Sequence, residues 1–532
     1  MISQLDQGMS TALANIREWR NTFVPINRLP LDVLSLISTH LGGDGDIVSI
    51  SSTCRHWRNT FTQHAALWSE LNLSLKRTSI FVRTRLERAK GSPLDITTAG
   101  FSRDNILALL SARSQQFRSL DFIHDRWSSV RQFSEISSGP LPLLHDLKIN
   151  IVDDDSEDRT PPSSPLFTGA VNLKAFSLVV EGQPCFDRFA FPTLTTFNLT
   201  VTPTEGESFH TSQMLDFLGA TPTLQTVRIV IRGQKTPAGV DQGRIVVLPN
   251  VESFSVTERE PGYEIAAHIS CPSANRTTLV LEQDVYDPVP PGIFPTSATW
   301  GDIPPQHTLT QMNKAQLDLV TSRNLLCYLT LLSPDSAVLD LGYGIVASED
   351  DDDFDIIEQI SADQQAEVFC QACNSIQGHP LFPNVSSLYI QDRGAFYNQV
   401  QRARIAVGIG LLLRRAGTLD DLTLDLSDLQ LFVAPFIDHP FFQDLNNWYT
   451  YPQIKTLTII ERGIFKHLEE ECKVAIVELA KRQHGLGVPF ECVEFQMVIL
   501  PEDMVERLQP WVGATYCYQE TIEDDDEDKI LV

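Results

Sequence analysis

The sequence lacks several features that would assign it to a class of protein at once. No run reaches the roughly 18 apolar residues that span a bilayer, so we expect no membrane segment. The segment Met1–Trp19 has no apolar core behind a basic end, so it does not resemble a secretory signal. Nine cysteines scattered over 532 residues do not predict a disulfide framework. We therefore expect an intracellular protein, in the cytoplasm, the nucleus or both.

Motifs that carry catalysis or hold a cofactor are also lacking. There is no G-x-S-x-G, no Walker phosphate loop and no H-E-x-x-H, and the 12 histidines are dispersed. Cys370, Cys373 and His379 offer at most three zinc ligands, whereas a structural site needs four. We therefore predict no catalytic residue, no cofactor and no metal. The rival hypothesis is a nucleotide-cofactor enzyme, because Gly342 and Gly344 resemble a methyltransferase turn, although an acidic run follows them.

Positive charge is scarce outside the first part of the chain. Residues 1–150 hold 17 Lys+Arg and 13 Asp+Glu, whereas the rest holds 24 and 55, and the formal net charge is −27. Nucleic acids and anionic membranes bind basic surfaces, so we expect neither as a partner. Acidic runs at 153–158, 349–355 and 523–528 predict solvated loops and a solvated tail, because dense like charges repel one another.

Short helices are predicted at the start of the chain. Residues 10–24 carry Leu13, Ile16, Trp19 and Phe23 at helical spacing, and this helix is expected to pack on the next helices or to self-associate. A second helix begins at Pro30 and ends at Gly42-Gly43. Two more come after it, the last with apolar residues at steps of three or four from Cys54 to Trp68. Helices this short must bury their inner faces against one another.

The segment from Leu29 to Leu73 resembles an F-box. The residues that carry the resemblance are Leu29-Pro30, Asp32, Val33-Leu34, Ile37, His40-Leu41, Ile47-Val48, Cys54-Arg55-His56-Trp57-Arg58 and Leu67-Trp68. The preceding Val24–Arg28 resembles the lead-in that is common in fungal F-box proteins. Asp32 departs from the family pattern, in which glutamate is commoner, and the loop Gly42–Gly45 is slightly long.

This resemblance implies a docking surface for the Skp adaptor, which links to a cullin. A three-helix unit cannot bury both sides of its apolar residues, and an apolar surplus marks a binding site. A core role is favoured for Trp57 and Cys54, and an interface role for Leu29, Pro30 and Leu34. The residues predicted to make the adaptor contact are Leu29, Pro30, Val33, Leu34, Ile37, Leu41, Ile47, Val48, Trp57, Leu67 and Trp68.

The remainder of the chain contains a loose repeat. Pro-x-apolar-x-x-apolar-x-apolar begins at Pro142, Pro192, Pro222, Pro249, Pro383 and Pro452, and copies without proline begin at Leu173 and Leu419. The alternation at the end of each copy predicts a short strand with one buried face. The pattern resembles degenerate leucine-rich repeats, although the Asn or Cys position after the core is mostly absent. An irregular α/β domain with pseudo-repeats is the competing interpretation.

We therefore predict an α/β protein: a three-helix F-box followed by an irregular leucine-rich-repeat-like solenoid with a parallel sheet on one face. The predicted divisions are an N-terminal helix (1–24), the F-box (25–75), a substrate-binding region (76–515) with loops near 152–168, 232–244, 284–310 and 347–356, and an acidic tail (516–532). The predicted function is a non-catalytic substrate adaptor of an SCF-type ubiquitin ligase, with an unknown and possibly basic protein substrate. A scaffold without a degradation substrate is the alternative.

Overall fold

Two compact units, Met1–Asn198 and Leu199–Val532, make up the chain in the computed structural model. The boundary between them falls inside strand β6 (Thr196–Thr202). The structure describes residues 2–21, 23–25, 29–30, 33, 36, 44–53, 55–74, 78–99, 104–136, 139–151, 164–182, 184–202, 211–232, 244–259, 265–284, 314–321, 325–333, 338–346, 367–368, 371–372, 385–392, 412–413, 419–426, 454–460, 470–496 and 502–518.

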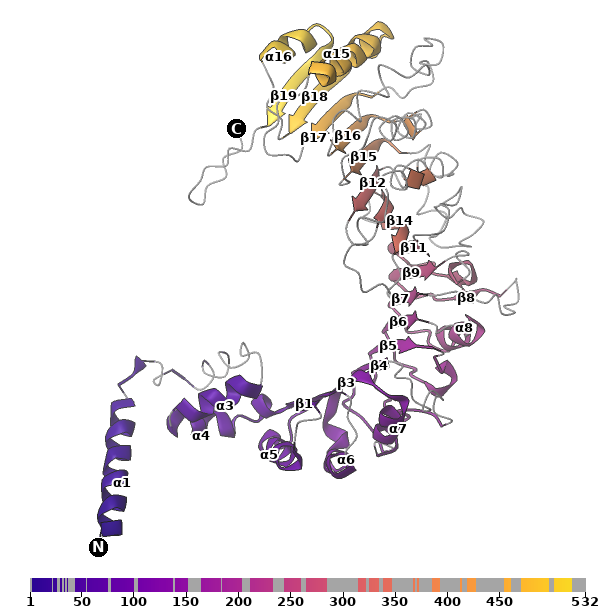
Figure 1. Ribbon diagram of the computed structural model, residues 1–532. Coiled ribbons are helices and arrows are strands. Elements are labelled where there is room, and N and C mark those ends of the chain that lie inside the picture. The colour runs from indigo at the N-terminus through magenta and orange to yellow at the C-terminus, as the bar shows by residue number, and fades with distance from the viewer. Residues whose placement is uncertain are drawn as a thin grey trace. The chain divides into compact units, whose positions relative to one another are not determined.

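The first unit begins with helices and continues as a sheet whose strands alternate with helices. Helix α1 (Ile2–Asn21), α3 (Asp44–Thr53), α4 (Arg55–Gln63) and the 3-10 helix η2 (Ala65–Trp68) precede the first strand. The strands are β1 (Glu70–Ser74), β2 (Leu94–Ala99), β3 (Phe117–Asp125), β4 (Asp146–Ile151) and β5 (Ala175–Glu181), each parallel to the next. Helices α5 (Ser79–Ala89), α6 (Asp104–Ser111) and α7 (Trp127–Ile136) lie on one face of this sheet (Figure 1).

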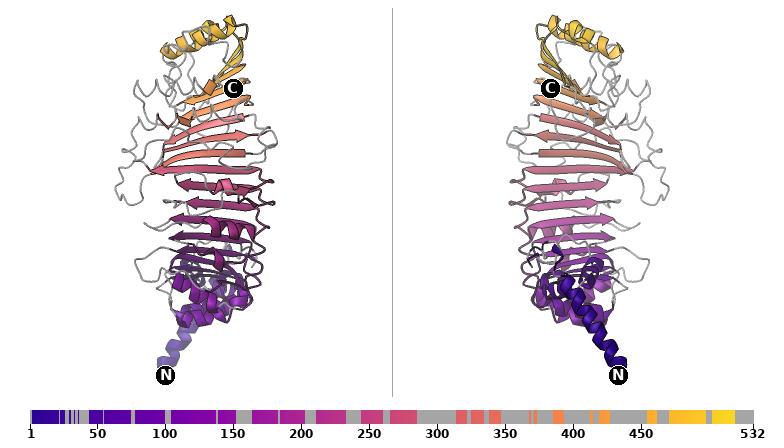
Figure 2. Two further views of the ribbon diagram at one scale, coloured as in Figure 1. Left: turned by 90° about the vertical axis from the view of Figure 1, so that its right-hand side faces the viewer. Right: turned by 90° about the vertical axis from the view of Figure 1, so that its left-hand side faces the viewer.

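A row of apolar side chains crosses these five strands and forms the core of the first unit. Leu71, Ile96, Leu120, Leu147 and Phe176 are paired in register from strand to strand. Each is at most 1% exposed. Burial of such a side chain contributes about 1.5–3 kcal/mol, so every repeat is stabilised by its neighbours. The strands follow one another as successive rungs in Figure 2.

A tight turn precedes most of the repeated strands and explains the Pro-x-apolar pattern. In the turn 141–144 the Leu144 amide donates to the Leu141 carbonyl. The same donation from the fourth residue to the first closes the turns 170–173, 191–194, 221–224, 248–251 and 271–274. Proline takes the second place in five of these six turns, where its fixed φ suits a turn and no amide hydrogen is required.

Side chains in these turns connect each repeat to the one before it. The third residue of a turn donates a hydrogen bond to the carbonyl of the second residue of the preceding turn. In the first unit, Asn172 Nδ2 lies 2.8 Å from the Pro142 oxygen, and Thr193 Oγ1 lies 2.9 Å from the Val171 oxygen. In the second unit, Asn250 bonds to Pro222 at 2.9 Å and Ser273 to Pro249 at 2.6 Å. We call this series of bonds the turn ladder.

The second unit is a longer sheet whose strand order departs from chain order. Its pairing order is β7, β9, β11, β14, β13, β12, β15, β16, β17, β18 and β19. Their bounds are β7 (Thr226–Ile231), β9 (Ser253–Arg259), β11 (Arg276–Asp284), β12 (Lys314–Thr321), β13 (Leu325–Leu332), β14 (Val338–Val346), β15 (Ser387–Asp392), β16 (Asp421–Leu426), β17 (Thr456–Ile460), β18 (Phe490–Gln496) and β19 (Val512–Tyr518). A separate parallel pair joins β8 (Val246–Val247) to β10 (Ile269–Ser270), beside helix α8 (Thr211–Gly219).

The sheet is largely parallel, as predicted, but two antiparallel pairings interrupt it. β13 runs antiparallel to both β12 and β14, whereas β14 is parallel to β11 and β12 is parallel to β15. The segments 322–324 and 334–337 join these three strands. Connections this short allow only antiparallel neighbours, because a parallel pair needs a crossover of a dozen or more residues. The proline-rich segment predicted as a break connects β11 to β12 and lies outside the described residues, apart from Asp284.

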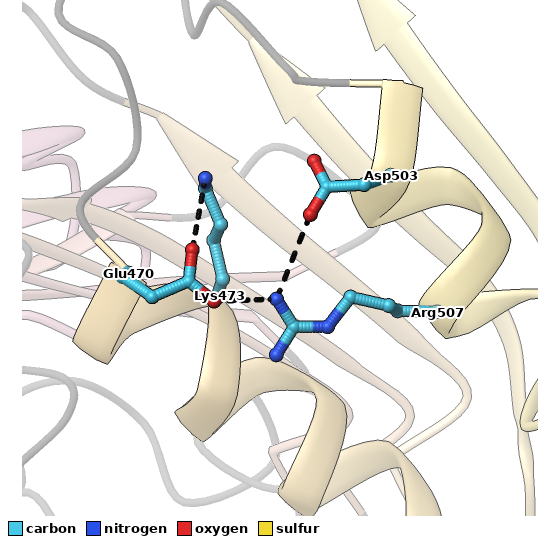
Figure 3. A network of polar contacts seen from close by, with 4 residues as sticks. All are labelled: Glu470, Lys473, Asp503 and Arg507. Atoms are coloured by element: carbon cyan, nitrogen blue, oxygen red, sulfur yellow. Dashed lines mark hydrogen bonds and ion pairs between the residues drawn. The ribbon is translucent and has the colours of Figure 1, made fainter.

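The end of the sheet carries two helices that are joined by ion pairs. Helix α15 (Glu470–Gly485) packs against β18, and α16 (Glu502–Leu508) packs against β19. Glu470 accepts from Arg507 at 2.7 Å and from Lys473 at 3.1 Å, and Asp503 lies 3.7 Å from Arg507 (Figure 3). The hydrogen bonds from Arg507 and then from Lys473 lower the pKa of Glu470. The ionised carboxylate therefore stabilises the contact between α15 and α16, and this stabilisation is complete at pH values above the ordinary pKa of glutamate.

Most predicted helices lie where the sequence placed them, with two differences in detail. The N-terminal helix begins at Ile2 rather than at residue 10. The predicted helix from Cys54 to Trp68 is divided, because His64 is extended between α4 and η2. Between the repeated strands the sequence also predicts helices at 106–110, 213–218, 400–413 and 468–480. Helices α6, α8 and α15 lie at the first, second and fourth of these segments, and only residues 412–413 of the third are described. The acidic runs lie outside the described residues, and β19 continues through Tyr518 into the predicted tail.

The turn ladder predicts a measurable contribution from an exposed asparagine. Replacing Asn250 with alanine removes the bond to the Pro222 carbonyl, which should lower the free energy of unfolding by about 1 kcal/mol. The control is Asn250→Ser, because Ser273 makes the equivalent bond in the next turn and serine should retain most of the stability. Urea denaturation followed by circular dichroism measures both variants. Equal midpoints for alanine and serine would argue against the ladder.

Candidate functional site

The start of the F-box segment is described at four positions, Leu29, Pro30, Val33 and Leu36, of which the last two are helical. Leu29 is half-buried and Pro30 is exposed. Val33 is 38% exposed and Leu36 is 62% exposed. Apolar side chains at the surface beside one another suit a protein contact. Leu36 was not among the predicted contact residues, although it lies one helical turn after Val33 and its exposure is the larger of the two.

The other predicted contact residues fall into three groups. Trp57, Leu67 and Trp68 are buried, at 8%, 9% and 3% exposure. Ile47 and Val48 lie on α3, which packs against α4. Leu34, Ile37 and Leu41 lie outside the described residues. The structure therefore brings the three large residues into an interior, as favoured for Trp57, and the adaptor contact of the whole set stays a prediction.

Trp68 is held by three kinds of contact at the end of η2. Its indole Nε1 donates to the Phe61 carbonyl at 2.8 Å. The Arg88 guanidinium lies 4.3 Å from the centre of the indole ring, and the Arg85 guanidinium lies 5.4 Å from it. A guanidinium over an indole face is attracted by the ring's quadrupole. Trp57 stacks on Phe61 with ring centres 5.5 Å apart, so both tryptophans pack on the same phenylalanine residue.

These contacts join the F-box helices directly to the first strand of the sheet. Arg85 and Arg88 belong to α5, which follows β1 in the chain. Arg85 is 2% exposed and donates from Nη1 to the Glu70 carbonyl at the start of β1. β1 then pairs in parallel with β2. Trp68 and Arg85 therefore fix the end of the F-box segment to the first repeat, within one compact unit.

A polar face occupies the last part of the second unit's sheet. The apolar residues of β15 to β18 point into the core, and the residues that alternate with them are Tyr389, Gln391, Thr423, Asp425, Thr458, Ile460, Glu494 and Gln496. Registered pairing aligns Tyr389 with Thr423, Thr458 and Glu494, and Gln391 with Asp425, Ile460 and Gln496. We call this set the polar face.

Asp425 is the best-connected group of the polar face. It is 2% exposed, and its Oδ2 accepts from the Tyr389 hydroxyl at 2.5 Å and from Gln391 Nε2 at 2.6 Å. Thr458 donates to Glu494 at 3.5 Å on the neighbouring strands. Hydrogen bonds to a carboxylate fix side chains in one arrangement, and Asp425, Gln391 and Thr458 are buried there. No motif in the sequence marked these residues, because the bonds connect strands 34 and 36 positions apart.

The thiols of Cys185, Cys271 and Cys492 have raised pKa values, which favours the protonated form at neutral pH. Burial raises the pKa of Cys185 and of Cys271 to about 12. Burial, followed by the nearby Glu494 carboxylate, raises the pKa of Cys492 to about 11. A nucleophilic or redox-active cysteine requires a thiolate, so these three side chains do not supply one.

The rival enzyme hypothesis requires a ligand-binding turn at Gly342 and Gly344. The backbone at both glycines is an extended strand rather than a turn. Both glycines lie within β14, where Gly342 pairs with Val280 of β11 and with Tyr328 of β13. The backbone amides and carbonyls of this segment pair with strands on both sides, so they are not available to bind a nucleotide. Cys370, Cys373 and His379 lie outside the described residues. Among the residues that the structure describes, no cluster of three or more metal-ligating side chains occurs.

The helices of the described segments do not suit a membrane span. None of them combines the length and the apolar character needed to cross a bilayer.

Comparison with known proteins identifies one region of the chain. Residues 26–74 match the F-box-like family, which covers α3, α4, η2 and β1. No curated protein matches the chain. A crystal structure of a TLR13–ssRNA13 complex aligns with 76% of this chain and 46% of that one, at 11% sequence identity and a TM-score of 0.28. A similarity this low carries no argument about fold or function. The chain therefore contains an F-box-like domain at residues 26–74.

Trp68 should contribute strongly to the stability of the first unit. Trp68→Ala removes the bond to Phe61, the contacts with both arginines and the buried ring, so we expect a loss of about 3–5 kcal/mol. Trp68→Phe is the matched control, because it keeps one aromatic ring beneath Arg88 and loses the indole donor and the second ring. It should cost roughly 1–2 kcal/mol. Urea unfolding measures both, and a loss for alanine no larger than that for phenylalanine would contradict the assignment.

Proposed function

We propose that the protein is a substrate-recognition adaptor of an SCF-type ubiquitin ligase. The observation that carries the proposal is the F-box-like domain at residues 26–74, whose last element, β1, is the first strand of a long sheet. F-box domains bind the Skp adaptor, which brings a cullin and the conjugating machinery. The chain itself contributes no catalysis. It acts by holding a substrate near the conjugating enzyme and so raising the effective concentration of the substrate's lysines.

The adaptor contact in this proposal uses the apolar residues of the first F-box helix. The exposure of Val33 and Leu36, and the position of Pro30 at the surface, support that contact. The remaining members of the proposed surface are Leu29, Leu34, Ile37, Leu41, Ile47 and Val48. Trp57, Leu67 and Trp68 belong to the contact in a supporting role, since they are buried beneath the segment and fix its helices.

The substrate in this proposal binds the region that follows the F-box. We propose that residues 76–515 form an irregular leucine-rich-repeat-like solenoid, with residues 1–24 as a separate helix and 516–532 as an acidic tail. The turn ladder and the parallel pairing of successive strands support stacked repeats. Glu494 of the polar face is half-buried rather than buried, and the chain's net charge of −27 favours a basic partner.

The joint at Trp68 gives the proposed function a mechanical basis. A substrate held on a sheet is presented to the conjugating enzyme in a reproducible position only if the F-box and the sheet move together. Trp68 packs under Arg88, and Arg85 bonds to β1, so rotation between the F-box and the first strand would break several buried contacts. This geometry fixes the F-box-like domain to the sheet of the first unit.

Three substitutions in the first helix should abolish adaptor binding. The variant Leu29→Ala with Pro30→Ala and Leu34→Ala removes the apolar side chains that we place in the contact, and a loss of at least about 100-fold in affinity is expected. Ile80→Ala is the matched control, because Ile80 is 76% exposed on α5 and lies outside the F-box segment. Surface plasmon resonance with the purified Skp adaptor measures both. Unchanged affinity for the triple variant, with an unchanged circular dichroism spectrum, would refute the contact.

Affinity purification separates an adaptor of proteolysis from a scaffold. Under proteasome inhibition, the intact chain and the triple variant should recover the same substrate, whereas only the intact chain should recover the Skp adaptor and the cullin. The half-life of that substrate should lengthen when the triple variant replaces the intact chain. A retained partner whose half-life is the same in both cases would favour the alternative, an F-box scaffold without a degradation substrate.

Glu494→Lys on the polar face should reduce recovery of a basic substrate.

A further inference from the structure

The N-terminal helix displays an apolar surface that the proposed adaptor function does not use. Met9, Ile16 and Trp19 of α1 are 64%, 61% and 68% exposed, and Leu13 between them is 51% exposed. Phe23 lies just after the helix, where its amide donates to the Arg20 carbonyl and its ring meets that of Trp19 at 4.9 Å. The phenylalanine therefore extends the same surface beyond the last turn.

The spacing of this surface is that of a coiled coil. Intervals of three and four residues alternate without exception along the series Ile2, Leu5, Met9, Ala12, Ile16, Trp19 and Phe23. A repeat of 3.5 residues keeps one seam facing a partner helix, whereas a helix packed on a globular core typically has a broader apolar stripe. The outward heptad positions are polar apart from Ala14: Ser3, Gln4, Gln7, Ser10, Thr11, Arg17, Glu18 and Asn21.

We propose that α1 pairs with α1 of a second copy of this chain as an antiparallel two-stranded coiled coil. In the antiparallel register that places Ala12 of one copy against Ile16 of the other, Met9 meets Trp19 and Leu5 meets Phe23. Each layer of the seam then pairs a smaller side chain with a larger one. Each heptad core position from Leu5 to Phe23 has a partner, so the register uses nearly the whole length of α1.

Charge favours the antiparallel arrangement over the parallel one. Asp6 and Arg20 both occupy the position that flanks the seam, on either side of Leu13. In the antiparallel pair, Asp6 of one copy lies beside Arg20 of the other at both ends, and the two Leu13 side chains meet in the middle. In a parallel pair, Arg20 would face Asn15 and Asp6 would face Met1, with no opposite charge on either of those side chains. Flanking charges of this kind set partner choice and orientation.

The mass of the full-length chain tests the proposal. Sedimentation from about 1 to about 100 µM should show a concentration-dependent shift toward twice the monomer mass of 59.5 kDa. Ile16→Asp places a charge in the seam and should leave a monomer at every concentration. Thr11→Asp is the matched control, because it adds the same charge to the opposite side of the helix and should leave the shift unchanged. A wild-type chain that stays monomeric throughout would overturn the proposal.

Charge reversal tests the orientation independently of helix stability. Asp6→Arg places two arginines beside each other, Arg20→Asp places two aspartates beside each other, and each variant alone should dimerise about tenfold more weakly. An equimolar mixture of the two should recover wild-type dimerisation, because every flanking pair is then of opposite sign. Failure of the mixture to recover, or single variants that dimerise normally, would overturn the antiparallel pair. Loss of Skp adaptor binding in Ile16→Asp with no change in mass would instead assign the surface to the adaptor.

Discussion

The structure depends on the bonds that connect each turn to the turn before it. A single strand with its helix leaves one apolar face uncovered, so each repeat is stable only beside its neighbours. The buried row from Leu71 to Phe176 supplies the attraction in the first unit, but apolar burial has little directional preference. The turn ladder supplies direction. Asn172 and Asn250 each bind a specific carbonyl of the preceding repeat, which fixes the register in which apolar residues meet.

The sequence was sufficient to predict the repeated strands but not their order. The Pro-x-apolar spacing identified strands β4, β6, β7, β9, β15 and β17. In that spacing a proline in a turn is followed by residues that alternate between buried and exposed positions. No proline stands four residues before the antiparallel strands β12 and β13, so no repeat marked them. The turn ladder was also missed. Its donors are Asn, Thr and Ser in turn, and the interval to the acceptor varies between 22 and 30 residues.

The sequence predicted where the F-box lies. It did not predict which of its residues are buried or which arginines contact them. Leu29-Pro30 and Cys54–Arg58 indicated an F-box, and the match over residues 26–74 confirms an F-box-like domain. The same pattern could not separate residues that face a partner from residues that face the interior, because both are apolar. Trp57 and Trp68 are buried, whereas Val33 lies at the surface. Arg85 and Arg88 come from the next helix and match no motif, so their contacts with Trp68 depend on the fold alone.

The antiparallel strand β13 has a consequence for how the second unit acquires its structure. An uninterrupted repeat array can begin folding anywhere and extend outward through local contacts. Here β11 lies against β14, with Arg276 and its partner Val338 62 positions apart, and β12 closes onto β15 after a comparable span. Both closures must form before the sheet is continuous, and long-range closure is slow. We therefore expect these two closures to form more slowly than the local pairings of β13 with β12 and β14.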